Sequence, residues 1–511
     1  MTDKDERLRL YTSILPSPVQ KSFEDTGFNI FIHYGINTFI GKEWSDGSAS
    51  PSLFDPEDQN TDEWAKTAKA AGAKGIILTC KHHDGFCLWQ TKTTAYSLAS
   101  SPYKNGKGDV VKELSESCRK FGLKFGVYLS PWDRNSPLYG TDKYNDFYIA
   151  QLRELLTNYG EIFCVWLDGA CGSYMDGKPA QVYDFERIYA TVRALQPHCA
   201  ISNCGPDVRW VGNEAGKTRK SEWNVVPEFS FDVQKIAENS QQSDDPSFRK
   251  KGLDAMSEDL GSREVLDAYD SFIWYPAEAD VSIRPGWFWH KCENLAVRSL
   301  DNLTFIYYSS VGGNTLLLLN VPPNKKGRIE KRDQKVLCAL GERIKAHFSA
   351  PVPCSYTAEN ADPAFPASNL SAEREGYFRA GGIEQSYEIE ARFSSPTLVD
   401  KVLLRENCDF SQRVESFDLF AVTEKGEKKV CSGTTIGFKR IATFKKIKAS
   451  AIRLVITSCR LEPYLEIFQP YAFNGKVPSQ PLTDKIAAFI RGVGQKMYYK
   501  RLKKQKQKQE I

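Results

Sequence analysis

The sequence predicts a (β/α)8-like barrel followed by a C-terminal β-sandwich, and two patterns carry this prediction. Over about the first 350 residues, short apolar runs alternate with segments of helical periodicity. After that point the pattern changes to two-residue alternation, with no helical stretch between the alternating segments. The change of period marks a boundary between two domains of different class.

Eight apolar runs in the first part are predicted to be buried strands. They are residues 28–36, 74–80, 124–131, 162–169, 200–205, 271–276, 304–311 and 316–322. Strands that are apolar on both faces and separated by helices form a parallel sheet covered by helices. Eight such units in one domain favour a closed barrel over an open doubly wound sheet.

The segment "GDVVKELSESCRKFG" is typical of the helices between these runs. Asp109 can cap its start, apolar residues follow at a spacing of about 3.6, and Gly122 can end it. Residues 206–270 are polar, rich in charge and long for a barrel loop. We expect them to form an insertion on the active face.

The second part alternates with period two in "SYEIEARF" and "SAIRLVITS". This spacing puts one set of apolar residues on a common face in each segment, as expected for a sandwich of about 120 residues. The expected domains are residues 1–348 for the barrel, 352–473 for the sandwich and 474–511 for a basic tail. We expect the tail to form a short packed helix and then a solvated terminus.

Composition excludes several partners. The chain of 511 residues has 68 basic and 64 acidic side chains, so its charge does not indicate nucleic acid. The N-terminal "MTDKDERLRLYTSILPSPVQ" resembles no signal peptide, and no apolar run approaches the ~18 residues of a membrane span. Thirteen cysteines without CxxC spacing predict reduced thiols and a cytoplasmic protein, or a secreted one if a signal was removed.

Polar side chains stand at the ends of four consecutive predicted strands. They are His33, the pair His82 and His83, Tyr128 and Asp168. Catalytic groups of such barrels cluster where strands end, so we expect these side chains to meet at one mouth. Trp166 shares a face with Asp168. From the residues alone, Asp168 is equally well a nucleophile or a cap of the next helix.

The stretch "CKHHDGFCLW" raises three alternatives for its histidines: a metal site, a polar ligand pocket or structural roles. Adjacent residues of a strand point to opposite faces, which disfavours chelation. Neutral imidazoles both donate and accept hydrogen bonds, which suits sugar hydroxyls. Aromatic rings that can form pocket walls or core are Trp44, Trp89, Trp166, Trp210, Trp274, Trp287 and Trp289.

Several motifs together resemble the α-L-fucosidases of glycoside hydrolase family 29: "FIHYGINTFIGKEW", "TCKHHDGFCLW", "GVYLSPWD", "VWLDGA" and "WVGNEAG". The combination of "KHHDGF" with "WLDG" about 80 residues later is the most specific of these features. The resemblance covers the barrel and, more loosely, the sandwich. It implies a retaining enzyme that acts on fucosylated oligosaccharides or glycoconjugates without a metal or another cofactor.

The resemblance also implies residue roles. Asp168 would be the nucleophile, and the fucose pocket would contain His33, Trp44, His82, His83, Tyr128 and Trp166. For the methyl group of fucose, Phe39 and Tyr34 are candidate contacts.

Two glutamates compete for the role of general acid/base. Glu214 lies in "GNE" and Glu278 in "WYPAEADVSIRPGWFWH", while Glu222 is a weaker candidate. These two tracts resemble the subfamily that cuts α-1,3 and α-1,4 branches, which implies Glu214 as the acid/base, Glu278 among the substrate-binding residues and Lewis-type glycans as substrates. A structural salt bridge is the alternative for each glutamate.

Other functions stay open at this point. One alternative is a lectin-like protein that binds fucose without catalysis, and another is a metal-dependent hydrolase built on His82, His83 and Asp84. The sandwich resembles discoidin-like, galactose-binding modules. It is expected either to bind glycan or shape the barrel mouth, or to be a packed accessory domain.

Overall fold

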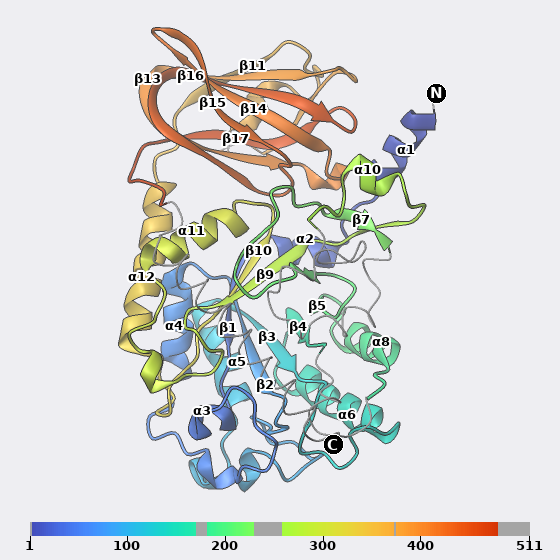
Figure 1. Ribbon diagram of the computed structural model, residues 1–511, viewed down its shortest axis with the longest axis vertical. Helices are drawn as coiled ribbons and strands as arrows, with labels where there is room; N and C mark the ends of the chain where they lie inside the picture. The colour runs from blue at the N-terminus through green and yellow to red at the C-terminus, as the bar shows by residue number, and fades with distance from the viewer. Residues whose placement is uncertain (1–2, 170–180, 229–257, 372–374, 479–511) are drawn as a thin grey trace, which may run out of the picture.

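The computed structural model describes residues 3–169, 181–228, 258–371 and 375–478. A barrel forms the larger part of the molecule and an antiparallel sandwich the smaller part (Figure 1). The predicted tail helix and basic end fall in residues 479–511, which lie outside the described residues.

The barrel is one sheet of eight strands in the order β5-β4-β3-β2-β1-β10-β9-β6, and every neighbouring pair is parallel. A parallel bridge between Ser202 and Val208 draws the two ends of the sheet together. The predicted barrel is therefore confirmed, as a nearly closed one. Its strands are β1 (Phe28–Ile32), β2 (Gly75–Lys81), β3 (Lys124–Leu129), β4 (Cys164–Leu167), β5 (Ala200–Asn203), β6 (Arg209–Trp210), β9 (Ala277–Ser282) and β10 (Leu316–Asn320).

Helices cover the outside of this sheet. The Asp109 side chain accepts a hydrogen bond from the Lys112 amide at the start of α5, and Gly122 ends that helix at φ 67°, as its sequence predicts. No helix among the described residues is long and apolar enough to cross a bilayer. The α-helices of this domain are α2 (Pro18–Glu24), α3 (Ile36–Ile40), α4 (Thr61–Ala71), α5 (Val110–Phe121), α6 (Lys143–Asn158), α8 (Phe185–Leu195), α11 (Leu300–Ser310) and α12 (Lys331–His347).

One predicted strand is a helix. Residues 304–310 belong to α11 and Val311 is its C-cap, while its first turn is capped by the Ser299 hydroxyl accepting from the Asn302 amide. The helix is buried on most sides, so its sequence is a nearly continuous apolar run. Such a run does not distinguish a buried strand from a buried helix.

The apolar run at residues 271–276 is also not the barrel strand that the sequence predicts. It contains β8 (Phe272–Trp274), which pairs antiparallel with β7 (Val225–Pro227) in a separate two-stranded sheet. The barrel strand is β9, which follows Pro276 and alternates acidic with apolar residues. Because the acidic residues are turned into the barrel, no continuous apolar run marks this strand.

The barrel interior is a small core of its own. It contains aromatic and aliphatic side chains from alternate strand positions, among them Phe31, Ile77, Tyr128, Trp166 and Leu318. The Phe31 ring lies 5.3 Å from that of Trp166 and 5.8 Å from that of Tyr128. These rings form a floor beneath the strand ends.

The sandwich shows the predicted alternation. Tyr387, Ile389, Ala391 and Phe393 are all buried, and the residues between them are exposed or half-buried. Helix α12 ends at His347, and the first sandwich strand, β11, begins at Cys354. Its strands are β11 (Cys354–Ala358), β12 (Phe378–Arg379), β13 (Tyr387–Glu406), β14 (Val414–Thr423), β15 (Gly426–Gly433), β16 (Arg440–Cys459) and β17 (Tyr464–Ala472).

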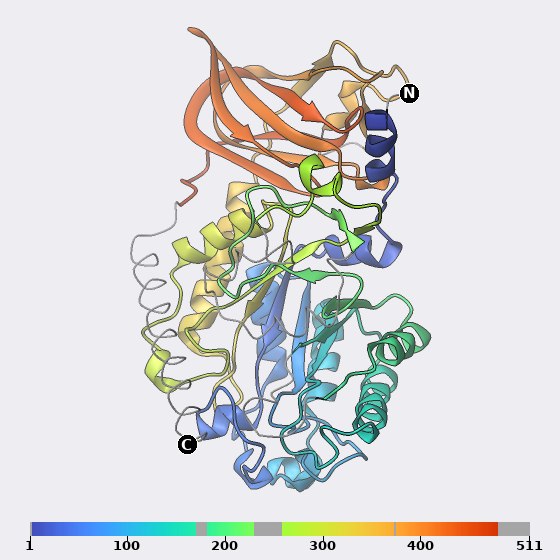
Figure 2. The ribbon, with the colours of Figure 1, turned by 45° about the vertical axis from the view of Figure 1, so that its right-hand side comes forward.

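The sandwich lies at the end of the barrel where the strands begin (Figure 1). A backbone bridge joins Gly313, just before β10, to Arg440 at the start of β16. Helix α1 (Asp3–Thr12) runs beside the sandwich, as Figure 2 shows. Of the alternatives for the sandwich, the one in which it shapes the barrel mouth is therefore wrong, because the mouth is formed by the opposite ends of the parallel strands.

Most of the described part of the expected insertion also lies away from the active face. Arg263 of α10 (Arg263–Leu266) pairs with Glu415 of the sandwich at 2.6 Å, and the Thr434 hydroxyl donates to the Lys220 carbonyl. The β7–β8 sheet packs on Tyr11 of α1. Only the turn around Glu214 reaches toward the mouth, and residues 229–257 lie outside the described residues.

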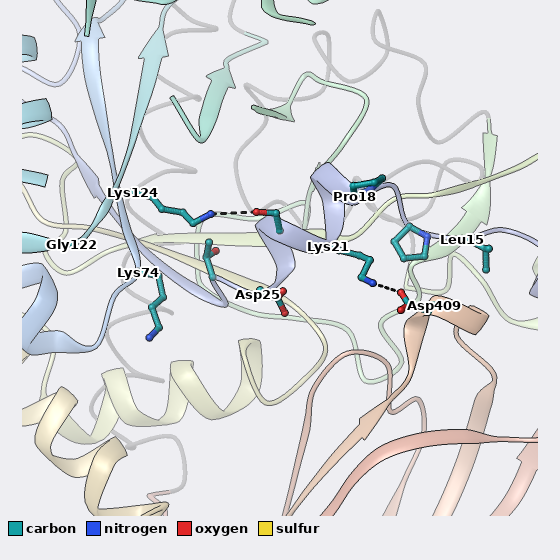
Figure 3. A pocket seen from close by; sticks show the side chains of 11 residues that line it. Leu15, Pro18, Lys21, Asp25, Lys74, Gly122, Lys124 and Asp409 are labelled. Atoms are coloured by element: carbon teal, nitrogen blue, oxygen red, sulfur yellow. Dashed lines mark hydrogen bonds and ion pairs between the residues drawn. The ribbon is translucent and has the colours of Figure 1, made fainter. Parts of the chain in front are cut away.

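A cavity of about 780 Å³ opens at the base of the barrel, between the strand starts and the sandwich (Figure 3). Lys21 pairs with Asp409 across it, and the Lys124 ammonium lies 3.3 Å from the Ser22 hydroxyl. This cavity is at the opposite end of the strands from Asp168, so it is separate from the site described next. Its lining is Leu15, Pro16, Pro18, Lys21, Ser22, Asp25, Thr26, Lys74, Gly122, Lys124 and Asp409.

Candidate active site

Asp168 stands at the end of β4 with 21% of its side chain exposed. The hydroxyl of Tyr128, from the neighbouring strand β3, donates to its Oδ2 at 2.9 Å. His83 Nε2 lies 3.8 Å from the same oxygen. The carboxylate therefore accepts a hydrogen bond from Tyr128, lies close to an imidazole and still reaches solvent.

The three predicted histidines lie together at the mouth. The ring centroids of His82 and His83 are 4.0 Å apart, and His33 is 5.7 Å from His82. The expectation that the adjacent histidines face opposite ways is wrong, because β2 ends at Lys81 and both residues lie in the turn that follows. Trp287 covers His33, with 5.0 Å between ring centroids.

Hydrogen bonds fix the tautomer of His33. The Asn320 amide nitrogen donates to the Ser282 hydroxyl and to the Trp287 carbonyl. Its oxygen therefore faces His33 and accepts from Nδ1 at 2.9 Å. Burial lowers the pKa of His33 to about 3. His33 is thus a neutral imidazole whose Nε2 is an acceptor.

His82 and His83 complete a set of donors and acceptors. His82 Nδ1 lies 3.4 Å from the Asn37 amide nitrogen, which also donates to the Glu43 carbonyl, so Nε2 carries the hydrogen. The Ser130 hydroxyl donates to the Trp132 carbonyl and accepts from His83 Nδ1, so Nε2 of His83 is an acceptor. Burial lowers the pKa of His83 to about 4 and that of His82 well below its usual range.

Two carboxyls lie deeper, on the inward face of β9. Glu278 is 2% exposed, and its Oε1 accepts from the Trp166 indole at 2.8 Å and from the Ser202 hydroxyl at 3.1 Å. Burial raises the pKa of Glu278 to about 7. Asp280, two residues on, is 4% exposed and accepts from the Trp210 indole at 2.8 Å.

Glu214 is an exposed carboxylate in the turn after β6. The Trp287 indole lies 3.3 Å from its Oε2. Trp287 is itself positioned by Glu43, whose carboxylate accepts from the Trp287 amide at 2.8 Å. His290 Nε2 lies 2.6 Å from the same carboxylate, so Glu43 holds both ends of this segment.

The weaker candidate, Glu222, is a structural residue. It is completely buried and paired with Arg209 and Arg219. Burial alone would raise the pKa of this carboxyl, yet the two guanidinium groups lower it. A carboxylate locked between two arginines has no path to a substrate.

The aromatic candidates divide between the mouth and the core. Trp44 is 37% exposed, and its ring lies 5.9 Å from that of His83. Trp89 is fully buried and bonds to Glu154 of α6, on the outside of the barrel. Trp274 packs in the cluster at the base. Trp89 and Trp274 are therefore core residues.

The prediction that Tyr34 and Phe39 contact the methyl group of fucose is also wrong. Tyr34 is 1% exposed and packs edge to face on Phe54 and Trp64, in the layer between strands and helices. Phe39 packs on the same Phe54. Both rings are therefore directed away from the mouth.

Comparisons with known proteins agree with this geometry. The family model described as "Alpha-L-fucosidase" matches residues 9–347. The chain belongs to the α-L-fucosidase family. It is 39% identical to "Alpha-L-fucosidase 1" of Arabidopsis thaliana over 471 residues, which covers 89% of this chain and 87% of the plant protein. It is thus a glycoside hydrolase of family 29.

Solved structures are similar along nearly the whole chain. A Bacteroides ovatus protein described as an α-L-fucosidase is 40% identical with a TM-score of 0.82, covering 94% of this chain and 78% of that one. A Ruminococcus gnavus family 29 fucosidase in complex with fucose is 29% identical with a TM-score of 0.79, covering 91% and 96%. The sandwich is thus part of the shared architecture.

The structure also bears on the two alternative functions, a metal-dependent hydrolase and a lectin without activity. Among the described residues, no group of three or more His, Cys, Asp or Glu side chains is placed to hold a metal ion. His82 Nδ1 lies 4.0 Å from Asp84, whose Oδ1 instead accepts from the Phe86 amide. The family assignment and this geometry give no support to a metal-dependent hydrolase or to a lectin without activity.

Sequence reasoning missed Asp280, Asn320 and Glu43. Asn320 ends β10 and so follows the same strand-end rule that selects His33 and Asp168. Asp280 belongs to a period-two pattern, with Glu278 before it and Ser282 after it. Glu43 acts through a contact to Trp287, 244 positions away, and no local pattern marks it.

Proposed function

We propose that this α-L-fucosidase works by a retaining double displacement, with Asp168 as the nucleophile and Glu214 as the general acid/base. One observation carries the proposal: Asp168 combines partial exposure at a strand end with a fixed hydrogen bond from Tyr128. Glu214 is an exposed carboxylate beside Trp287 at the mouth, where it can reach the leaving group. A nucleophile and an acid of this kind are what the mechanism requires.

In the first step an Asp168 oxygen attacks the anomeric carbon and the glycosidic bond breaks. Glu214 gives its proton to the leaving oxygen. The Tyr128 hydroxyl keeps one Asp168 oxygen oriented while the other forms the ester. In the second step Glu214 takes a proton from water, the water oxygen bonds to the anomeric carbon, and the ester bond breaks. Fucose leaves with its original configuration.

The histidine group supplies the hydroxyl contacts of the sugar. His33 offers an acceptor, His82 a donor and His83 an acceptor, and all three are neutral because they are buried. Neutral groups bind a neutral sugar without a charge that would need a counterion. Trp44 and Trp166 contribute apolar faces for the ring carbons.

For specificity we propose α-1,3- and α-1,4-fucosylated glycans of the Lewis type. The support is that Trp210, Trp287 and Glu214 stand together at the rim, where a second sugar next to the cleaved bond would lie. Half-buried indoles present flat apolar surface to such a sugar. A branched substrate, with a sugar on the adjacent carbon, would contact more of this surface than a linear α-1,2 fucoside.

Two measurements test these points. Proton NMR of the first fucose formed from an aryl α-fucoside should show the α anomer, whereas the β anomer would refute double displacement. Competition between a Lewis-type trisaccharide and an α-1,2-fucosylated lactose should favour the trisaccharide by at least tenfold in kcat/KM, about 1.4 kcal/mol. Equal rates, or faster cleavage of the α-1,2 substrate, would refute the specificity.

A further inference from the structure

Asp280 is a buried carboxyl that the mechanism above does not use. It lies on the inward face of β9, two residues after Glu278 and two before Ser282. Only 4% of it is exposed, and its Oδ1 accepts from the Trp210 indole at 2.8 Å. A buried carboxyl whose side-chain partner is an indole is costly in its charged form, so it favours holding a proton.

The chain path brings Glu214 over this carboxyl. Trp210 pairs with Glu278 in the barrel sheet, and the Val211 amide donates to the Glu278 carbonyl at 2.9 Å. The chain then turns, and Ala215 forms an antiparallel bridge with Val281. Glu214 and Asp280 are the neighbours of these two bridged residues, so the turn folds the acid/base against β9.

Electrostatics couple the two carboxyls. Burial raises the pKa of Asp280 well above its usual range, and Glu214 raises it further. Glu278, on the same strand, acts in the same direction with a smaller effect, and the Trp210 indole opposes them by donating to the charged form. Two carboxyls in this situation titrate as a pair rather than separately.

We propose that Asp280 is a positioning residue for Glu214, with which it shares one proton throughout the neutral pH range. This inference rests on the proposed role of Glu214 as the acid/base. The shared proton keeps Glu214 able to act as an acid, because losing it would leave two adjacent negative charges in a site of low polarity.

The same pair serves both steps of the reaction. When Glu214 gives its proton to the leaving oxygen, the pair holds no proton and both carboxylates are charged. Their repulsion makes Glu214 a stronger base, which draws the proton from the attacking water. That proton returns the pair to its starting state, so no other proton donor is needed.

The test is the alkaline limb of kcat/KM against pH, measured with a fucoside that has a poor leaving group. Asp280→Asn preserves the acceptor for Trp210 but removes the second charge. The limb should move to lower pH by about one unit or more, as expected for carboxyls coupled this strongly. Trp210→Phe removes the donor that favours the charged form, so its limb should move to higher pH.

Glu278→Gln is the matched control, since it removes a buried carboxyl from the same strand whose partners are Trp166 and Ser202. Its limb should move less than that of Asp280→Asn. An unchanged limb in Asp280→Asn, or movement of both Asp280→Asn and Trp210→Phe in one direction, would overturn the inference. So would weaker inhibition by fucose at every pH with an unmoved limb, because Asp280 would then bind the sugar directly.

Glu214→Gln separates this inference from the function on which it rests. Slow cleavage of poor leaving groups by Glu214→Gln, together with an unmoved limb in Asp280→Asn, would refute only the role of Asp280. Normal cleavage of those substrates by Glu214→Gln would refute the acid/base assignment itself.

Discussion

Two buried carboxyls at the barrel mouth and two near the junction with the sandwich have different partners. In the barrel, Glu278 and Asp280 accept from the indoles of Trp166 and Trp210. At the junction, Glu222 pairs with Arg209, and Glu415 pairs with Arg263. Burial alone would raise the pKa of Glu222 and of Glu415, but the arginines lower both, whereas the pKa of Glu278 rises to about 7.

This difference separates carboxyls that can exchange a proton from carboxyls that are held in the charged form. A guanidinium holds its carboxylate partner in the charged form, because the charge-assisted hydrogen bonds between them stabilise the ion pair. An indole holds a carboxyl in place by one neutral hydrogen bond and leaves its protonation open. Of these four carboxyls, the two with indole partners can therefore change their protonation, whereas the two paired with Arg stay charged.

The largest effect is expected for Asp168→Asn, which removes the nucleophile and preserves its shape. We expect kcat to fall by about a thousandfold or more, while fucose still binds through the histidines. Glu415→Gln, the control at the junction, should keep kcat within about twofold at temperatures where it is folded. Retention of more than about a tenth of kcat by Asp168→Asn, a loss under ~1.4 kcal/mol, would exclude Asp168 as nucleophile.

The next effect depends on the leaving group. Glu214→Gln should slow the cleavage of poor leaving groups by about a hundredfold or more and affect activated aryl fucosides far less, because these need no proton. A series of aryl fucosides of graded acidity measures this dependence. If Glu278→Gln shows the dependence and Glu214→Gln does not, the two glutamates exchange roles.

At the junction the expected effect is on stability. Glu222→Gln leaves Arg209 and Arg219 buried without their counterion, which should lower the free energy of unfolding by about 3–5 kcal/mol. Urea titration measures it. The variant should keep its leaving-group dependence where it is folded. A stable Glu222→Gln protein with an altered dependence would show that Glu222 belongs to the active site.

The smallest effect is a difference in pH dependence. The folded pKa of Glu278, about 7, exceeds the usual 4.5, so the folded state binds more protons between these values. Glu278 therefore makes the protein less stable as pH rises from about 4.5 to about 7, by up to ~1.4 kcal/mol per unit. Glu278→Gln should remove this slope when its urea midpoints at pH 5 and pH 7.5 are compared with wild type.

Glu222 should show the opposite sign. Its folded pKa lies below 4.5, so its contribution to stability is present above that value and is lost as pH falls through the folded pKa. If the stability of the Glu278→Gln and Glu222→Gln variants changed equally between pH 5 and pH 7.5, the result would contradict the distinction between the two regions.

The sequence predicts much of the fold because burial determines its pattern. Continuous apolar runs mark β1 to β5 and β10, whose two faces are both covered, and Tyr387, Ile389 and Ala391 show the alternation of the sandwich. The residues at the barrel mouth can be predicted from one rule, that side chains at the ends of parallel strands converge. That rule finds His33, Tyr128 and Asp168 without any knowledge of their contacts.

The remaining features depend on long-range contacts. Strand β9 is missed because Glu278 and Asp280 interrupt its apolar pattern, and their partners come from Trp166 and Trp210 elsewhere in the barrel. Helix α11 is mistaken for a strand because it is buried on most sides. The structural role of Glu222 depends on its contacts with Arg209 and Arg219, which only the folded chain creates.

The most direct test of the account is the configuration of the fucosyl azide formed by two variants. Without its nucleophile, Asp168→Gly should accept azide in the place of the carboxylate and convert an aryl α-fucoside to β-fucosyl azide. Without its base, Glu214→Gln should form the ester and release it to azide as α-fucosyl azide. These two products together are the predicted result. An α product from Asp168→Gly, or an α-fucosyl azide from Glu278→Gln and none from Glu214→Gln, would contradict the assignment of the two carboxylates.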